Sequence, residues 1–199
     1  MYTGKLVLAP MVRSGELPTR LMALKYGADL VWTPEIIDKK IIKCERVENS
    51  KTGTVDFLEI LGHNKKPKFP GYSNLVFRTF PEKERGKLIF QMGTANAELA
   101  VQAAKIVAAD VDGIDVNAGC PKPFLTHAGM GAALLSTPDL LESILRNLVT
   151  EVGTIFKIPI SVKIRLMSDT DAEPTVALIN RLCQTGITNL TLHCRTRDM

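Results

Sequence analysis

The sequence predicts an α/β fold, a (β/α)8 TIM barrel that stops after about its sixth strand. Short apolar runs alternate with segments of helical periodicity, which is the pattern of repeated βα units. The apolar runs are continuous, as in parallel strands covered on both faces. Such units form either an open doubly wound sheet or a barrel. Polar residues at the ends of the expected strands favour the barrel, because barrels carry their catalytic groups there; these residues are Asn117, Lys163, Arg165 and His193.

Six strands and four main helices are expected in alternation along the chain. The strands are residues 6–9, 28–32, 87–92, 113–116, 160–164 and 189–193. The helices are residues 17–26, 97–109, 138–153 and 175–183. Gly27, Gly153 and Gly186 are expected to stop three of the helices, and Pro10 and Gly93 end two of the strands.

Residues 36–86 interrupt this alternation. We expect one short helix at residues 36–44 and a hairpin-like pair of strands near residues 55–58 and 75–80. A closed barrel needs eight strands. Either the barrel is incomplete or this insertion holds further strands, and we expect a single incomplete barrel domain over residues 1–199.

The composition is that of a globular protein with a mildly basic charge. Hydrophobic residues make up 45%, charged residues 23%, and the net charge is +4, which argues against a mainly disordered chain. The four cysteines lack CxxC spacing, so we expect neither a zinc site nor a disulfide framework, and a reducing intracellular compartment fits. No apolar run approaches the roughly 18 residues of a membrane span, and we expect no membrane partner and no metal.

The densest candidate for a site is the segment Asp115-Val-Asn-Ala-Gly-Cys-Pro-Lys122. A strand delivers Asn117 and Cys120 into a loop in which Gly119 permits a sharp turn. A thiol has a reference pKa near about 8.5 and is mostly protonated at pH 7. Cys120 therefore suits the role of an acid, with a nucleophile or a packing residue as the alternatives.

Charged and polar residues follow the other expected strands. Lys163 and Arg165 alternate along one strand and share a face, which suits an anionic ligand or a developing negative charge, or else an exposed sheet edge. A Schiff-base aldolase that uses Lys163 is also compatible with this pattern. His193 ends the sixth strand, and Glu35 and Gln91 follow the second and third strands.

Taken together, these segments resemble the tRNA-dihydrouridine synthases, flavoenzymes that reduce uridine in tRNA. The stretch from Asn117 to Cys120 with the downstream Gly129-Met-Gly131 is the specific part of the resemblance. Residues 15–24 and 32–38 look most like the fungal members of the eukaryotic branch that acts at position 20 of the D-loop. The remaining matches are Leu8-Ala-Pro-Met-Val-Arg13, Gly27-Ala-Asp29, Phe90-Gln-Met-Gly93, Val162-Lys-Ile-Arg165 and Leu192-His193.

The resemblance implies a flavin-binding (β/α)8 barrel, with FMN as cofactor, NADPH as hydride donor and the D-loop of tRNA as partner. In this family a cysteine protonates uracil C5 while hydride reaches C6, and Cys120 matches that general acid. Asn117 and Arg165 match contacts to the uracil or the flavin. The residues that match flavin contacts are Pro10, Met11, Val12, Glu35, Gln91, Lys163 and His193.

The length departs from the family pattern, because two barrel strands and a helical tRNA-binding domain have no counterpart in the 199 residues. The alternative function is therefore a catalytically inactive truncated barrel fragment with at most weak RNA binding. A dihydroorotate dehydrogenase-like flavin barrel would share the lysine but not residues 117–122. We expect an intracellular protein of the cytoplasm or nucleus or both, with the mitochondrion also open.

Overall fold

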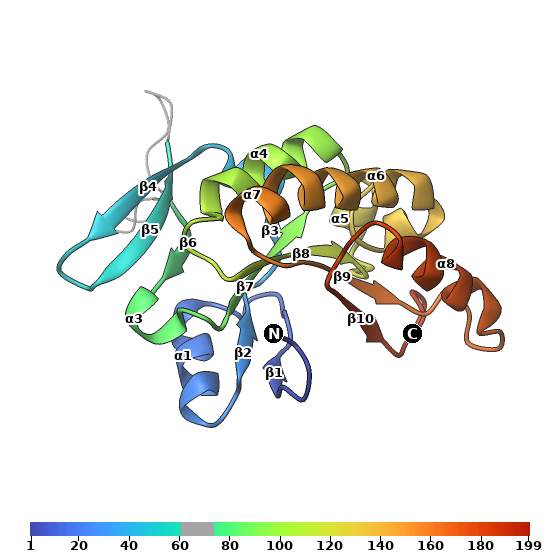
Figure 1. The fold of residues 1–199 in the computed structure, drawn as a ribbon, viewed down its shortest axis with the longest axis horizontal. Helices are drawn as coiled ribbons and strands as arrows, with labels where there is room; N and C mark the ends of the chain where they lie inside the picture. The colour runs from blue at the N-terminus through green and yellow to red at the C-terminus, as the bar shows by residue number, and fades with distance from the viewer. Residues whose placement is uncertain (61–73) are drawn as a thin grey trace.

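The computed structural model describes residues 1–60 and 74–199 and has a curled parallel sheet at its centre (Figure 1). Its six main strands run in the order β1-β2-β7-β8-β9-β10, and every neighbouring pair is parallel. A short strand, β3 (Ile36–Ile37), pairs with the carboxyl end of β7. The main strands are β1 (Val7–Leu8), β2 (Leu30–Trp32), β7 (Leu88–Gly93), β8 (Gly113–Ala118), β9 (Ile160–Arg165) and β10 (Asn189–His193).

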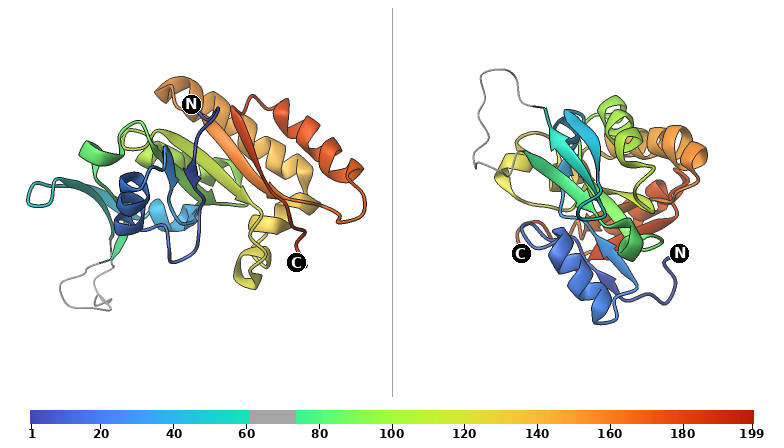
Figure 2. Two further views of the ribbon diagram at one scale, coloured as in Figure 1. Left: turned by 90° about the horizontal axis from the view of Figure 1, so that it is seen from below. Right: turned by 90° about the vertical axis from the view of Figure 1, so that its left-hand side faces the viewer.

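Helices connect the successive strands, as the barrel prediction requires. The longer ones are α1 (Leu17–Lys25), α4 (Ala97–Val107), α6 (Pro138–Leu148) and α8 (Glu173–Cys183). Helices α4, α6 and α8 lie in a row along the outer face of the sheet (Figures 1 and 2). The α/β class and the truncated barrel are confirmed: in the part of the chain that the structure describes, β1 and β10 are the two ends of the sheet and each pairs on one side only.

The main core lies between the sheet and these helices. Strand residues such as Phe90, Ile114 and Val162 are fully buried there. Ala100 and Ala104 of α4 are also fully buried, and their small side chains allow the helix to lie close to the sheet. The side chain of Asn96 caps α4 by accepting a hydrogen bond from the amide of Leu99 at 2.9 Å.

The insertion between β3 and β7 forms a second, antiparallel sheet of three strands, β4 (Cys44–Asn49), β5 (Thr54–Glu59) and β6 (Leu75–Thr79). The predicted helix 36–44 is wrong at both ends: only α2 (Asp38–Ile41) is helical, and Cys44 begins β4. The predicted hairpin is confirmed as β5 and β6, with Phe80 just after β6, and its connecting residues 61–73 lie outside the described residues. The Phe77 ring stacks on the Phe57 ring, with 5.2 Å between the ring centroids. It also packs edge-on against the Phe90 ring, with 5.4 Å between the centroids, and these contacts join the small sheet to the barrel core. Helix α3 (Pro81–Glu84) then leads into β7.

The helix expected over residues 138–153 is longer and less regular than predicted. After α6, residues Val149–Gly153 form a π-helical turn and α7 (Thr154–Phe156) follows. The end comes at Lys157, whose φ of 57° is left-handed. A Cβ on Gly153 would lie 3.1 Å from Cγ1 of Ile160. Gly153 therefore permits a close approach to β9 and does not stop the helix. Two short segments complete the fold, α5 (Pro123–Thr126) and a 3₁₀ turn at Gly131–Ser136.

Candidate active site

A cavity of about 640 Å³ lies at the carboxyl ends of the parallel strands. Its lining comes from the carboxyl-terminal halves of β7, β8, β9 and β10 and from the segments that follow β1, β2 and β8. All ten residues that the sequence predicts for a site line this one cavity: Pro10, Met11, Val12, Glu35, Gln91, Asn117, Cys120, Lys163, Arg165 and His193. Barrel enzymes place their chemistry at this end of the sheet, so the cavity is the candidate active site.

The loop after β8 holds Cys120 through its backbone. The side-chain oxygen of Asn117 accepts hydrogen bonds from the amides of Gly119 at 2.9 Å and Cys120 at 3.0 Å. Arg165 Nε donates to the carbonyl oxygen of Gly119 at 2.6 Å, and Arg165 Nη1 donates to that of Thr196 at 2.8 Å. Asn117 and Arg165, predicted as ligand contacts, thus also fix the position of the cysteine.

Gly131 packs closely against the same loop. It has a φ of 59°, and a Cβ there would lie 2.5 Å from the carbonyl oxygen of Cys120. That carbonyl accepts a hydrogen bond from the amide of Ala132 at 2.9 Å. The close approach of this turn to Cys120 therefore explains Gly131, the second glycine of the pattern Gly129-x-Gly131.

The electrostatic environment keeps Cys120 in its thiol form. Partial burial raises the pKa of the Cys120 thiol, and the charge of Glu35 raises it further. A backbone hydrogen bond from Lys122 and the positive charges of Lys122 and Arg165 act in the opposite direction. The raised pKa leaves the side chain with a proton to give at neutral pH.

Asp115 of β8 contacts the cavity residue Gln91 and was missed as a functional residue. Its buried carboxylate accepts hydrogen bonds from Gln91 Nε2 at 2.9 Å and from the Ser161 hydroxyl at 2.6 Å. The first bond fixes the Gln91 amide, and the negative charge of Asp115 favours the protonated form of Lys163. The sequence signal for Asp115 is its spacing, because it lies two residues before Asn117 in β8 and the two side chains therefore share one face of the strand.

The pKa of Asp115 makes a prediction about stability and pH. Burial raises the pKa of Asp115 from 3.8 to about 6, so the folded state binds this proton more tightly than the unfolded chain. The contribution of Asp115 to the unfolding free energy is largest below pH 3.8 and decreases as the pH rises towards 6. Asp115→Asn keeps both hydrogen bonds if the Ser161 hydroxyl rotates. Urea titrations are therefore expected to show that the unfolding free energy falls less in the variant than in the unaltered chain between pH 4 and 6. The difference in this fall is expected to be about 2–3 kcal/mol.

An unchanged pH profile in Asp115→Asn would contradict the raised pKa. Asp112→Asn is the control. Asp112 also accepts bonds, from the amides of Lys87 and Leu88 at 3.0 Å, but it lies at the amino end of the sheet, away from the cavity.

Three further side chains complete the charge pattern of the cavity. Burial lowers the pKa of Lys163, and Arg165 lowers it further. Burial and the positive charges of Lys163 and Arg165 lower the pKa of His193, so its imidazole is neutral at pH 7. Burial raises the pKa of Glu35 to about 7, and its Oε1 is buried without a hydrogen-bond partner in the described part of the chain.

Comparison with known families identifies this arrangement. The family model described as "Dihydrouridine synthase (Dus)" matches residues 70–199, which include β7 to β10 and the Cys120 loop. The chain belongs to the dihydrouridine synthase family.

Curated relatives in the family extend the match to the whole chain. The chain is 60% identical over 198 residues to the tRNA-dihydrouridine(20) synthase [NAD(P)+] of Saccharomyces cerevisiae, covering 100% of this chain and 50% of that protein. It is 51% identical over 201 residues to the enzyme of the same name from Schizosaccharomyces pombe, covering 39% of it. The tRNA-dihydrouridine(16/17) synthase of the latter organism is 31% identical over 194 residues, with 41% of it covered. The chain thus spans half or less of the length of these relatives.

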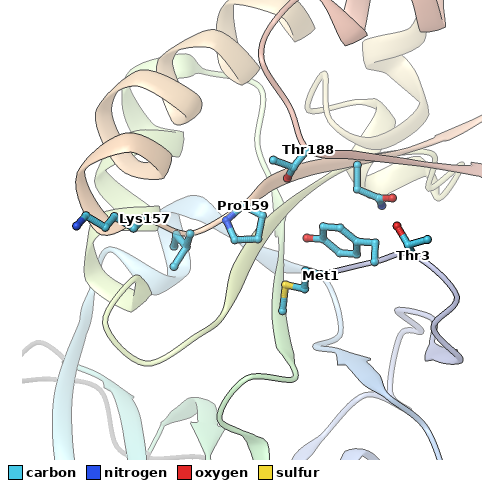
Figure 3. Close-up of a pocket in the computed structure, with 8 residues that line it drawn as sticks. Met1, Thr3, Lys157, Pro159 and Thr188 are labelled. Carbon is cyan, nitrogen blue, oxygen red and sulfur yellow. The ribbon is translucent and has the colours of Figure 1, made fainter.

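A second cavity, of about 630 Å³, lies at the opposite, amino end of the dihydrouridine synthase barrel (Figure 3). Its walls include Met1 and Thr3 together with Lys157 and Pro159 before β9 and Thr188 before β10. The amino-terminal segment underlies the sheet here, where the Tyr2 ring lies 6.1 Å from Trp32. The lining holds one lysine and no acid–base pair, so this cavity is not the candidate active site.

Three kinds of feature are absent from the described part of the chain: membrane-spanning helices, clusters of metal ligands and disulfides. Over residues 1–60 and 74–199, no helix is long and apolar enough to cross a membrane. Within the same ranges, no three His, Cys, Asp or Glu side chains gather as metal ligands. All four cysteines are free.

Proposed function

We propose that this chain provides the flavin- and uracil-binding barrel of a tRNA-dihydrouridine synthase that acts at position 20 of the D-loop, with FMN as cofactor and NADPH as hydride donor. The observation that carries the proposal is the convergence of ten side chains, from six separate strand ends, on one cavity beside the Cys120 loop. The identity of 60% to a relative named for uridine 20 supports the position.

The residues around the cavity fit a flavin. Its volume of about 640 Å³ lies within the range of cofactor pockets. Pro10, Met11 and Val12 offer an apolar wall, Gln91 offers an amide held by Asp115, and Lys163 and His193 stand at the ends of β9 and β10. Glu35 adds a buried oxygen without a partner, which suits an N–H group of a ligand. FMN, when bound, supplies the hydride chemistry between NADPH and the pyrimidine.

The side chains around the cavity have three further roles: charge stabilisation, proton donation and positioning. The ammonium group of Lys163 stabilises negative charge that develops in the cavity. The thiol of Cys120 gives its proton to C5 of the uracil. Asn117 and Arg165 hold the cysteine loop and contact the uracil or the flavin with their remaining polar atoms. The four free cysteines support an intracellular location, in the cytoplasm, the nucleus or both, with the mitochondrion as the third candidate.

Lys163 provides the test of flavin binding. Lys163→Met is expected to weaken the binding of added FMN by about tenfold to a hundredfold, because a charge-assisted hydrogen bond contributes about 1.5–3 kcal/mol. The measurement is the visible flavin spectrum of the chain during titration with FMN. Lys105→Met is the matched control, because Lys105 lies on the outer side of α4 and pairs with Glu151.

A chain that binds no FMN in this titration would overturn the proposal and favour the inactive fragment. Equal affinity of Lys163→Met and the unaltered chain would remove Lys163 from the flavin site. With flavin bound, the formation of dihydrouridine in tRNA that lacks it then tests the reaction itself.

A further inference from the structure

We propose that Glu35 is the electrostatic partner of Cys120, and that its carboxylate acts together with burial to hold the cysteine as a thiol, the form that donates a proton. The inference rests on the proposed function for its meaning, since a thiol donates a proton whereas a thiolate attacks carbon. Its physical content is a coupling between two side chains, and this coupling is measurable without flavin or tRNA. Neither the family match nor the names of the relatives assign this role to Glu35.

The fold brings the two residues together from distant parts of the chain. Glu35 lies in the short connection between β2 and β3, and Cys120 lies in the loop after β8. Both line the cavity at the carboxyl ends of the strands. Strand β3 fixes the position of this connection, because Ile36 and Ile37 pair with Met92 and Gly93 of β7.

Gly93 leaves the space that the Glu35 carboxyl occupies. A Cβ on Gly93 would lie 2.6 Å from Glu35 Oε1 and 3.1 Å from its carboxyl carbon. The backbone of Gly93 has no left-handed φ, so conformational freedom does not explain the glycine. Space for the carboxyl group does.

Asn117 connects the carboxyl group to the cysteine loop. Its side-chain oxygen accepts the hydrogen bond from the Cys120 amide at 3.0 Å, and its side chain lies close enough to the Glu35 carboxyl to lower the pKa of that group. One amide side chain therefore contacts both members of the pair.

The charged groups around the pair oppose one another. Lys122 and Arg165 favour a thiolate at Cys120, and Lys122 also favours a carboxylate at Glu35. Burial and the charge of Glu35 favour the thiol. Two cations beside a cysteine would ordinarily yield a reactive thiolate. Burial, the largest effect, and the carboxylate of Glu35 together outweigh the two cations, so the thiol form of Cys120 is favoured.

The pair also has a distinctive titration. Burial raises the pKa of Glu35 to about 7, so the carboxyl changes charge within the range in which thiol reactivity is measured. Below that pH a neutral Glu35 leaves the thiol more acidic, and above it the carboxylate makes the thiol less acidic. The thiolate fraction therefore rises with pH in two stages, separated by a flatter region near pH 7.

The experiment is the rate of alkylation of Cys120 by iodoacetamide from pH 5.5 to 10, read by mass spectrometry on the peptide that contains Cys120. The unaltered chain is expected to show the two-stage profile. Glu35→Gln removes the titrating charge, so its profile becomes a single titration, and the pKa of Cys120 falls by about one unit. At pH 7.5 about three-quarters of Glu35 is ionised in the unaltered chain, so the thiol of this variant is then alkylated about threefold faster.

Two further variants make the test specific. Lys122→Met is expected to shift the pKa of Cys120 in the opposite direction, with slower alkylation at pH 7.5. Glu98→Gln, an exposed carboxylate at the start of α4, is expected to leave the profile unchanged. A merely structural role for Glu35 would alter the rate without changing the shape of the pH profile.

A single-stage profile in the unaltered chain would overturn the proposal, as would an unchanged pKa of Cys120 in Glu35→Gln. If Glu35→Gln fails to fold, the profile of the unaltered chain and the shift in Lys122→Met decide the question. Failure of the proposed function is seen separately, as a chain without FMN binding whose Cys120 still shows the coupled titration.

Discussion

Replacement of Glu84 by alanine is expected to lower the unfolding free energy by about 3–5 kcal/mol, the cost of leaving a buried charge without its partner. The side chains of Glu84 and Arg20 are each 1% exposed. Arg20 Nε donates to Glu84 Oε1 at 2.6 Å, and Arg20 Nη2 donates to Oε2 at 3.1 Å. The variant would leave the guanidinium buried with backbone carbonyls alone, those of Gly15 and Arg78 at 2.7 Å.

The position of this ion pair explains why its loss affects the whole fold. Arg20 lies on α1, and Glu84 lies on α3 at the end of the small sheet, 64 residues later. Glu84 also accepts hydrogen bonds from the Thr79 hydroxyl and the Phe80 amide, both at 2.9 Å. The pair therefore connects α1 to the inserted sheet.

Urea denaturation at pH 7 measures the effect, with Asp139→Ala as the control. Asp139 also pairs with an arginine, Arg181, but its side chain is 92% exposed, so its loss is expected to cost less than about 1 kcal/mol. The double variant Arg20→Met with Glu84→Leu removes both charges and is expected to recover much of the stability. Similar stability losses in Glu84→Ala and Asp139→Ala would show that the buried pair is not a major source of stability.

The barrel could be predicted from the sequence because its strands are continuous apolar runs that alternate with segments of helical periodicity. Strand β4 could not, because Glu45 and Glu48 face solvent and its apolar residues are too few to form a pattern. Its partner β5 provides the missing context, through a six-residue antiparallel register that only the fold reveals.

The candidate site was predictable to a similar degree. Strand ends place Asn117, Cys120 and Lys163 at one edge of the sheet, and this convergence follows from parallel topology alone. The supporting contacts do not follow from it. The bond from Gln91 to Asp115 and the space that Gly93 leaves for Glu35 depend on side-chain directions and register, which composition and periodicity do not encode.

The thiol of Cys120 gives the largest expected effect on activity. In the FMN-loaded protein supplied with NADPH and tRNA, Cys120→Ala is expected to slow dihydrouridine formation by about a hundredfold to ten-thousandfold, the usual contribution of a general acid. FMN affinity is expected to stay within about twofold. The bonds to Asn117 and Ala132 use the backbone of residue 120, and alanine retains them.

Rates of dihydrouridine formation and FMN titrations on the same preparations separate these roles, with Cys183→Ala as the control at an exposed cysteine of α8. A loss of FMN from Cys120→Ala would make the cysteine a structural residue of the flavin site. An unchanged rate would assign the proton to another donor, and Glu35, whose pKa of about 7 leaves it partly protonated, would be the next residue to replace. A slow variant with intact flavin assigns the thiol to the reaction itself and not to flavin binding, because the thiol is then the one group removed.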